Sequence, residues 1–71
     1  MPDGAYVGWV DPGSVADASG LRPGDVIVQL AGQTVRTDRD VDGIMAKVRL
    51  GQVVDLLAWR NGQTFKVTVR F

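Results

Sequence analysis

A dense series of turn signals between Val10 and Gly32 constrains the fold of this chain most strongly. The stretch opens with the turn cluster Asp-Pro-Gly at positions 11–13. Ser14 follows as a good N-cap for a short helix over Val15–Ser19, because its hydroxyl can accept from a free backbone N–H of the first turn. Gly20 can adopt the left-handed conformation that ends such a helix. This half of the stretch therefore predicts one brief helix between two chain reversals.

The second half of the stretch predicts another tight turn and a buried strand. Pro23-Gly24 fits the two central positions of a type II turn, since Pro fixes φ and Gly tolerates a positive φ. The apolar residues of Val26–Leu30 then favour a strand. Gly32 can reverse the chain again, and Gln33–Val35 follows as a short extended piece.

The run PGSVADASGLRPGDVI, from Pro12 to Ile27, closely resembles the core of a PDZ domain. More narrowly, it resembles the bacterial type found in HtrA/Deg serine proteases, carboxyl-terminal processing proteases and site-2 proteases. The resemblance implies an α+β fold, a small partly open β-barrel or sandwich of about five strands with one short and one longer helix. It also implies a single domain over residues 1–71, of which residues 4–71 match the family and residues 1–3 are an N-terminal start. Domains of this type usually carry Asn-Gly after the buried strand, whereas Ala31 stands in the Asn position here.

The segments on either side of this core complete the expected element order. Ala5–Val10 predicts a first strand, weakened in its middle by Gly8. A longer helix is expected within Arg36–Gly51, where Thr37 and Asp40 have the spacing of a capping box. The apolar positions of this helix recur at i, i+3, i+4 and i+7 and therefore form one stripe: they are Val41, Ile44, Met45 and Val48.

The C-terminal part of the chain predicts a β-hairpin. Asn61-Gly62 separates Val53–Arg60 from Thr64–Phe71, and both turn residues tolerate the positive φ that a two-residue hairpin turn requires. Residues alternate between apolar and polar along the last strand, which indicates a strand with one face in water. In the resemblance to bacterial PDZ domains, this last strand corresponds to the strand that animal PDZ domains place first.

The composition argues against catalysis, metal binding and nucleic-acid binding by this chain. It contains no His and no Cys, so Ser–His and Cys–His catalysis and thiolate metal sites are excluded. Eight basic residues balance eight acidic ones, which gives no electrostatic reason to expect nucleic acid. Asp38, Asp40 and Asp42 lack the Gly and Glu spacing of a calcium loop and are better explained as acids at the start of a helix. No apolar run is long enough to insert into a membrane. We therefore expect a binding domain that uses no cofactor.

The resemblance implies that the partner is a protein or peptide. PDZ domains take an extended or C-terminal peptide as an added strand between a sheet edge and the longer helix. The residues expected at such a site are Tyr6, Val7, Trp9, Val41, Ile44 and Met45. Core packing is the simpler explanation for Val41 and Ile44, and core or edge packing for Tyr6 and Trp9. Met45 is the best groove candidate because its flexible side chain adapts to varied ligands. The absence of a helix-start His favours an apolar C-terminal residue in the ligand.

The loop that holds the peptide carboxylate in this family is expected before Ala5 and is not found in residues 1–4. Two function classes therefore stay open. The chain is either the peptide-recognition module of a bacterial envelope protease of HtrA/Deg type, or an assembly module without carboxylate binding, as in the PDZ-like domains of type II secretion. The parent protein is expected in the periplasm or cell envelope. Loss of a neighbouring strand would expose the Ala5–Val10 edge, where a second copy of the chain could pair.

Overall fold

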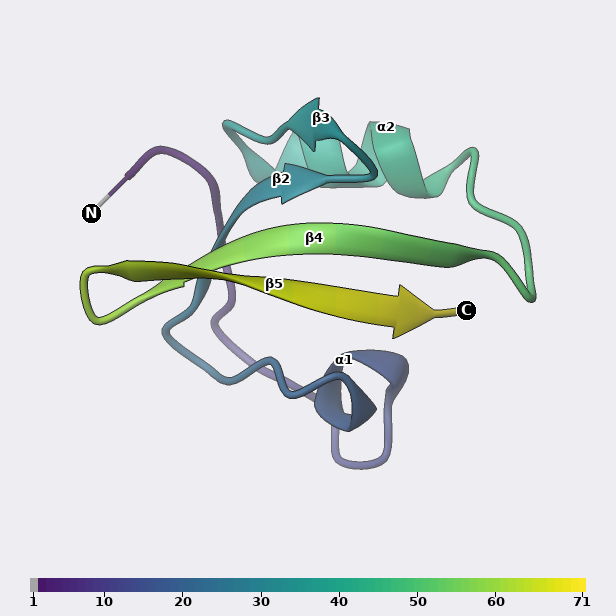
Figure 1. Cartoon of the computed structure of the whole chain (residues 1–71), viewed down its shortest axis with the longest axis horizontal. Coiled ribbons are helices and arrows are strands. Elements are labelled where there is room, and N and C mark those ends of the chain that lie inside the picture. The colour runs from purple at the N-terminus through teal and green to yellow at the C-terminus, as the bar shows by residue number, and fades with distance from the viewer. Residues whose placement is uncertain (1) are drawn as a thin grey trace.

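The computed structural model describes residues 2–71, which form one open antiparallel sheet of five strands with two helices (Figure 1). The elements in chain order are β1 (Ala5–Tyr6), α1 (Val15–Ala18), β2 (Val26–Leu30), β3 (Gln33–Thr34), α2 (Asp38–Met45), β4 (Val53–Arg60) and β5 (Gln63–Arg70). The sheet has the order β1-β2-β4-β5, and β3 also pairs with β2. The expected α+β class, with about five strands, one short helix and one longer helix, is confirmed; of the expected partly open barrel or sandwich, the structure shows a sheet that does not close into a barrel.

The sheet is organised around β2, which pairs with three other strands. β4 runs along one edge of β2, whereas β1 pairs with Val26 and Ile27 and β3 with Gln29 and Leu30. The register between β2 and β4 shifts between Ile27 and Gln29, so Val28 is an extra residue in a β-bulge. As a result, Ile27 and Leu30 lie opposite Ala58 and Leu56, on the same face of the sheet.

The predicted turn chemistry around α1 is confirmed in detail. The Ser14 hydroxyl accepts from the backbone N–H of Asp17 at 3.2 Å, and Gly20 follows the helix with φ +92°. In the next turn, Gly24 has φ +97° and the N–H of Asp25 donates to the carbonyl of Arg22 at 3.1 Å. These capped turns lead the chain from α1 directly into β2.

The longer helix begins where the sequence predicts but ends earlier. The Asp40 carboxylate accepts from the backbone N–H groups of Arg36 and Thr37, at 2.8 and 3.3 Å, and so satisfies donors at the helix start. The helix ends at Met45, and residues 46–52 form turns instead of continuing to Gly51. Gly43 lies within this short helix, where glycine weakens helix formation.

The first strand is also shorter than expected. β1 covers two residues, although Val7 continues the contact with the chain before β2 through hydrogen bonds to Asp25 and Gly24. Gly8 and the residues after it leave the sheet. Of the two packing roles expected for Tyr6 and Trp9, core packing is wrong, because these residues are 61% and 72% exposed, and edge packing remains. The Trp9 indole N–H instead donates to Asp11 at 2.7 Å, which a surface position allows.

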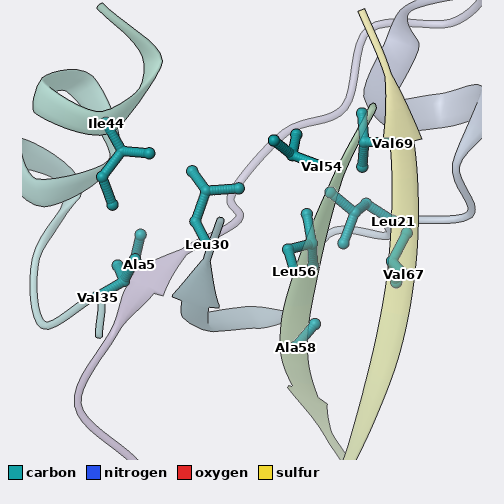
Figure 2. Close-up of a cluster of buried hydrophobic side chains, with 10 residues drawn as sticks. All are labelled: Ala5, Leu21, Leu30, Val35, Ile44, Val54, Leu56, Ala58, Val67 and Val69. Carbon is teal, nitrogen blue, oxygen red and sulfur yellow. The ribbon is translucent and has the colours of Figure 1, made fainter. Parts of the chain in front are cut away.

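The hydrophobic core lies between the sheet and the two helices (Figure 2). Figure 2 shows Ile44 of α2 grouped with Ala5 and Val35 on one side of Leu30, and the β4–β5 residues with Leu21 on the other. The predicted alternation of the hairpin is confirmed, because one face of it is buried: Val54, Leu56 and Ala58 from β4, with Val67 and Val69 from β5. Asn61 and Gly62 both have positive φ, as the hairpin turn requires.

Candidate functional site

An apolar groove opens on the core side of the sheet, between α1 and α2. It has a volume of about 200 Å³, and every residue that lines it is apolar. The lining residues are Val15, Ala16, Leu21, Ile27, Leu30, Val41, Met45, Leu56, Val69 and Phe71. A concave site of this kind recognises ligands by apolar side chains, because burial of apolar surface drives the association.

Local sequence features explain why these side chains meet. Val41 and Met45 are four residues apart in α2 and therefore lie on one face of the helix. Ile27 and Leu30 reach the groove together because the bulge at Val28 changes the register of β2. Phe71 follows β5 and is held in place by backbone hydrogen bonds to Gln52 and Gly51. The groove thus gathers residues that are far apart in the sequence, from Val15 to Phe71.

The structure separates the six residues that the sequence suggested for peptide binding into three groups. Val41 and Met45 line the groove and are half-buried. Ile44 points into the core with 8% exposure. Tyr6, Val7 and Trp9 lie in and after β1, outside the groove lining. A role for these residues in binding stays a prediction, and the geometry favours Val41 and Met45 most directly.

Several groove residues carry no signal that would have singled them out in the sequence. Val15 and Ala16 belong to α1, whose four residues are too few to show a helical apolar periodicity. Phe71 looks like the last core residue of a hairpin. Their shared position depends on how α1 and the end of β5 pack together, which is a tertiary property.

One buried charge lies directly before β2. Asp25 is 1% exposed, and its carboxylate accepts from the Arg60 guanidinium through Nε and Nη2, at 2.7 Å each. These hydrogen bonds from Arg60 lower the pKa of the Asp25 carboxyl below its ordinary value, and the lowering exceeds the opposing effect of burial. Asp25 is therefore ionised and paired at neutral pH.

Residues 2–71 contain no group of three or more carboxylates that could hold a metal ion. No helix among them is long and apolar enough to cross a membrane.

Comparison with known proteins identifies the family. A model of the PDZ domain matches residues 6–60, which is more than half of the chain. The chain belongs to the PDZ domain family. The PDZ resemblance read from the sequence is therefore confirmed, and with it the interpretation of this chain as a binding module and not a catalytic one.

Relatives of this PDZ domain include bacterial proteases, several of which are named as periplasmic DegP-like serine endoproteases. It is 37% identical over 68 residues to a Halomonas elongata protein named probable periplasmic serine endoprotease DegP-like, covering 96% of this chain and 14% of that protein. It is 35% identical over 66 residues to the magnetosome formation protease MamE of Paramagnetospirillum magneticum, covering 93% of this chain and 9% of MamE. This PDZ domain therefore spans only a small part of the length of these relatives.

Solved structures agree with this assignment. The HtrA-type protease AlgW with decapeptide superimposes with a TM-score of 0.85 at 32% identity, covering 92% of this chain and 20% of AlgW. The structural match and the sequence match thus both point to the HtrA type.

Proposed function

We propose that this PDZ domain is the peptide-recognition module of a bacterial envelope protease of HtrA/Deg type, and that it binds extended or C-terminal peptide segments by β-strand addition. The apolar groove between α1 and α2 carries this proposal, since it offers a pocket for apolar ligand side chains. The similarity to AlgW, whose structure is described with a decapeptide, supports a peptide ligand. The similarity to a probable periplasmic endoprotease supports a parent protein in the periplasm or envelope.

The groove also suggests which peptides bind. All ten lining residues are apolar, so a charged or strongly polar side chain would lose hydration there without gaining a partner. Met45 can adjust its conformation to different side chains, whereas Val41 gives the groove a rigid wall. We therefore expect a preference for peptides that end in an apolar residue. The edge of β1 offers the backbone for strand addition.

A peptide titration followed by NMR tests the proposal. The probe is a decapeptide with an apolar C-terminal residue, used both as the free acid and as the amide. Binding should shift the methyl signals of Met45, Val41 and Leu30, and Met45→Asp should abolish these shifts. Leu50→Asp is the matched control, because Leu50 is 96% exposed and lies outside the groove. Absence of shifts in the wild-type groove, or equal loss in both variants, would overturn the proposal.

A second candidate function is assembly without carboxylate recognition. It is favoured by the edge position of β1, beside which Tyr6 and Trp9 are exposed. In this alternative the edge pairs with a second copy of the chain or with another protein. The free acid and the amide should then bind equally or not at all. Sedimentation velocity should show association that rises with concentration and is weakened by Trp9→Lys. A strict monomer with slowly exchanging amides over residues 5–10 counts against it.

A further inference from the structure

The buried carboxylate of Asp25 is attached to the chain segment between α1 and β2. Besides its two hydrogen bonds from Arg60, Asp25 Oδ2 accepts from the backbone N–H of Arg22 at 2.9 Å. The carboxylate is therefore shared between a side chain at the end of β4 and a backbone group of the loop that leads away from α1. An ionised acceptor makes these hydrogen bonds stronger than neutral ones.

The guanidinium of Arg60 makes a second attachment to the same segment. Arg60 Nη2 donates to the carbonyl oxygen of Gly20 at 3.1 Å, in addition to its bond with Asp25. The guanidinium also lies over the Phe65 ring of β5, with Cζ 4.6 Å from the ring centroid, and this contact limits how the side chain can move. Figure 1 shows the segment from α1 to β2 passing beside the β4–β5 hairpin.

These two attachments flank one groove residue. Gly20 receives the Arg60 hydrogen bond, Arg22 donates to Asp25, and Leu21 lies between them. The Leu21 side chain is buried and lines the groove, and its N–H donates to the Ala16 carbonyl of α1 at 3.2 Å. Ala16 is itself a lining residue. Leu21 and Ala16 form one wall of the groove. The position of this wall relative to the sheet therefore depends on the Asp25–Arg60 pair.

We propose that Asp25 and Arg60 are positioning residues for the peptide groove: together they hold Leu21 and α1 at the distance from β2 and α2 that the ligand side chain requires. Neither residue lines the groove, so both act through Leu21. This inference rests on the proposed function, and it adds that affinity for an apolar peptide depends on a polar contact outside the groove. Arg60→Lys should be a poor substitute, because an ammonium group cannot bond Asp25 in a bidentate manner and reach Gly20 at the same time.

The test compares Asp25→Asn and Arg60→Lys with wild type by NMR titration with the same apolar decapeptide. Asp55→Asn is the matched control, since the Asp55 carboxylate also accepts a hydrogen bond, from Thr68 at 2.8 Å, but lies on the exposed face of the hairpin. We expect affinity to fall roughly fivefold in Asp25→Asn and Arg60→Lys and to stay unchanged in Asp55→Asn. Titrations are made at a temperature where denaturation curves show each variant to be folded.

Amide exchange separates positioning from general stability. In the two test variants the Leu21 amide should exchange faster, while the central amides of β4 and β5 keep their protection. Equal affinity and unchanged Leu21 exchange in Asp25→Asn would overturn the inference, as would uniform loss of protection throughout the domain. If the wild type bound no peptide, the proposed function would fail, and faster Leu21 exchange in the variants would still show that the pair holds this wall.

Discussion

Ala31 and Asn61 share nearly the same left-handed backbone conformation, with φ of +52° and +51°. Each is the first residue of a two-residue turn and is followed by a glycine, Gly32 or Gly62. Asn tolerates this conformation well, whereas the methyl group of Ala is crowded there. The β4–β5 turn therefore has a residue that suits this conformation, Asn61, whereas the β2–β3 turn has one that does not, Ala31.

Replacement of Ala31 by Asn should stabilise the domain by about 1 kcal/mol, because it relieves the unfavourable left-handed conformation. Urea denaturation measures the change as a higher midpoint with an unchanged slope. Asn61→Ala is the reciprocal control and should lower stability by a similar amount. A lower midpoint for Ala31→Asn would contradict this explanation of the turn.

Gly43→Ala should also be stabilising, by up to about 1 kcal/mol, since glycine weakens a helix interior. A methyl group at this position of α2 would meet nothing within 4 Å, so no steric cost offsets the gain. Thermal unfolding of the variant should show a higher midpoint. If the midpoint fell, Gly43 would have a role that the packing around it does not show.

Gly4→Ala should have the opposite effect and destabilise the domain by about 2 kcal/mol. A methyl group on Gly4 would overlap the carbonyl oxygen of Ile27 and lie 2.7 Å from Cγ1 of Val26. Because the first obstacle is backbone of β2, it cannot move aside without disturbing the sheet. Gly43→Ala, measured under the same conditions, serves as the control for the substitution itself. A Gly4→Ala variant as stable as wild type would mean that the chain before β1 can shift without cost.

The turns and the hairpin could be predicted because single residues determine them. Ser14, Gly20, Gly24 and Asn61 each satisfy a local requirement of cap or dihedral angle, and each lies where the sequence predicts. The residues at which α2 and β1 end could not be predicted in the same way from the sequence. Periodicity marked the apolar stripe of the helix, but whether its last turn forms depends on packing of the following loop. β1 ends at Tyr6, which pairs with Val26, the first residue of β2.

The groove was predictable only where it coincides with helix periodicity. Val41 and Met45 follow from the stripe, whereas strict alternation along β2 would place Ile27 and Leu30 on opposite faces. The bulge at Val28 brings them to the same face, and no residue type in β2 predicts this bulge. Likewise, the pairing of Asp25 with Arg60 joins positions 35 residues apart and depends on the finished sheet.

Acid should destabilise the domain partly through Asp25. Its carboxyl pKa is lowered in the folded state, chiefly by the hydrogen bonds from Arg60, so the folded state favours the ionised form. A group with a depressed folded pKa stabilises the protein above its unfolded pKa, which is near 3.8. This contribution is lost as the pH falls below that value and through the folded pKa.

We therefore expect the free energy of unfolding of the wild type to fall more steeply than that of Asp25→Asn as the pH is lowered from about 5 to about 2. Urea denaturation across this range measures both curves, and their difference isolates Asp25 from the other acids. Asp55→Asn is the control for the loss of one carboxylate and should run parallel to the wild type, since Asp55 lies on the exposed face of the hairpin, where its carboxylate accepts from Thr68. Parallel curves for wild type and Asp25→Asn would show that the ion pair contributes no pH-dependent stability.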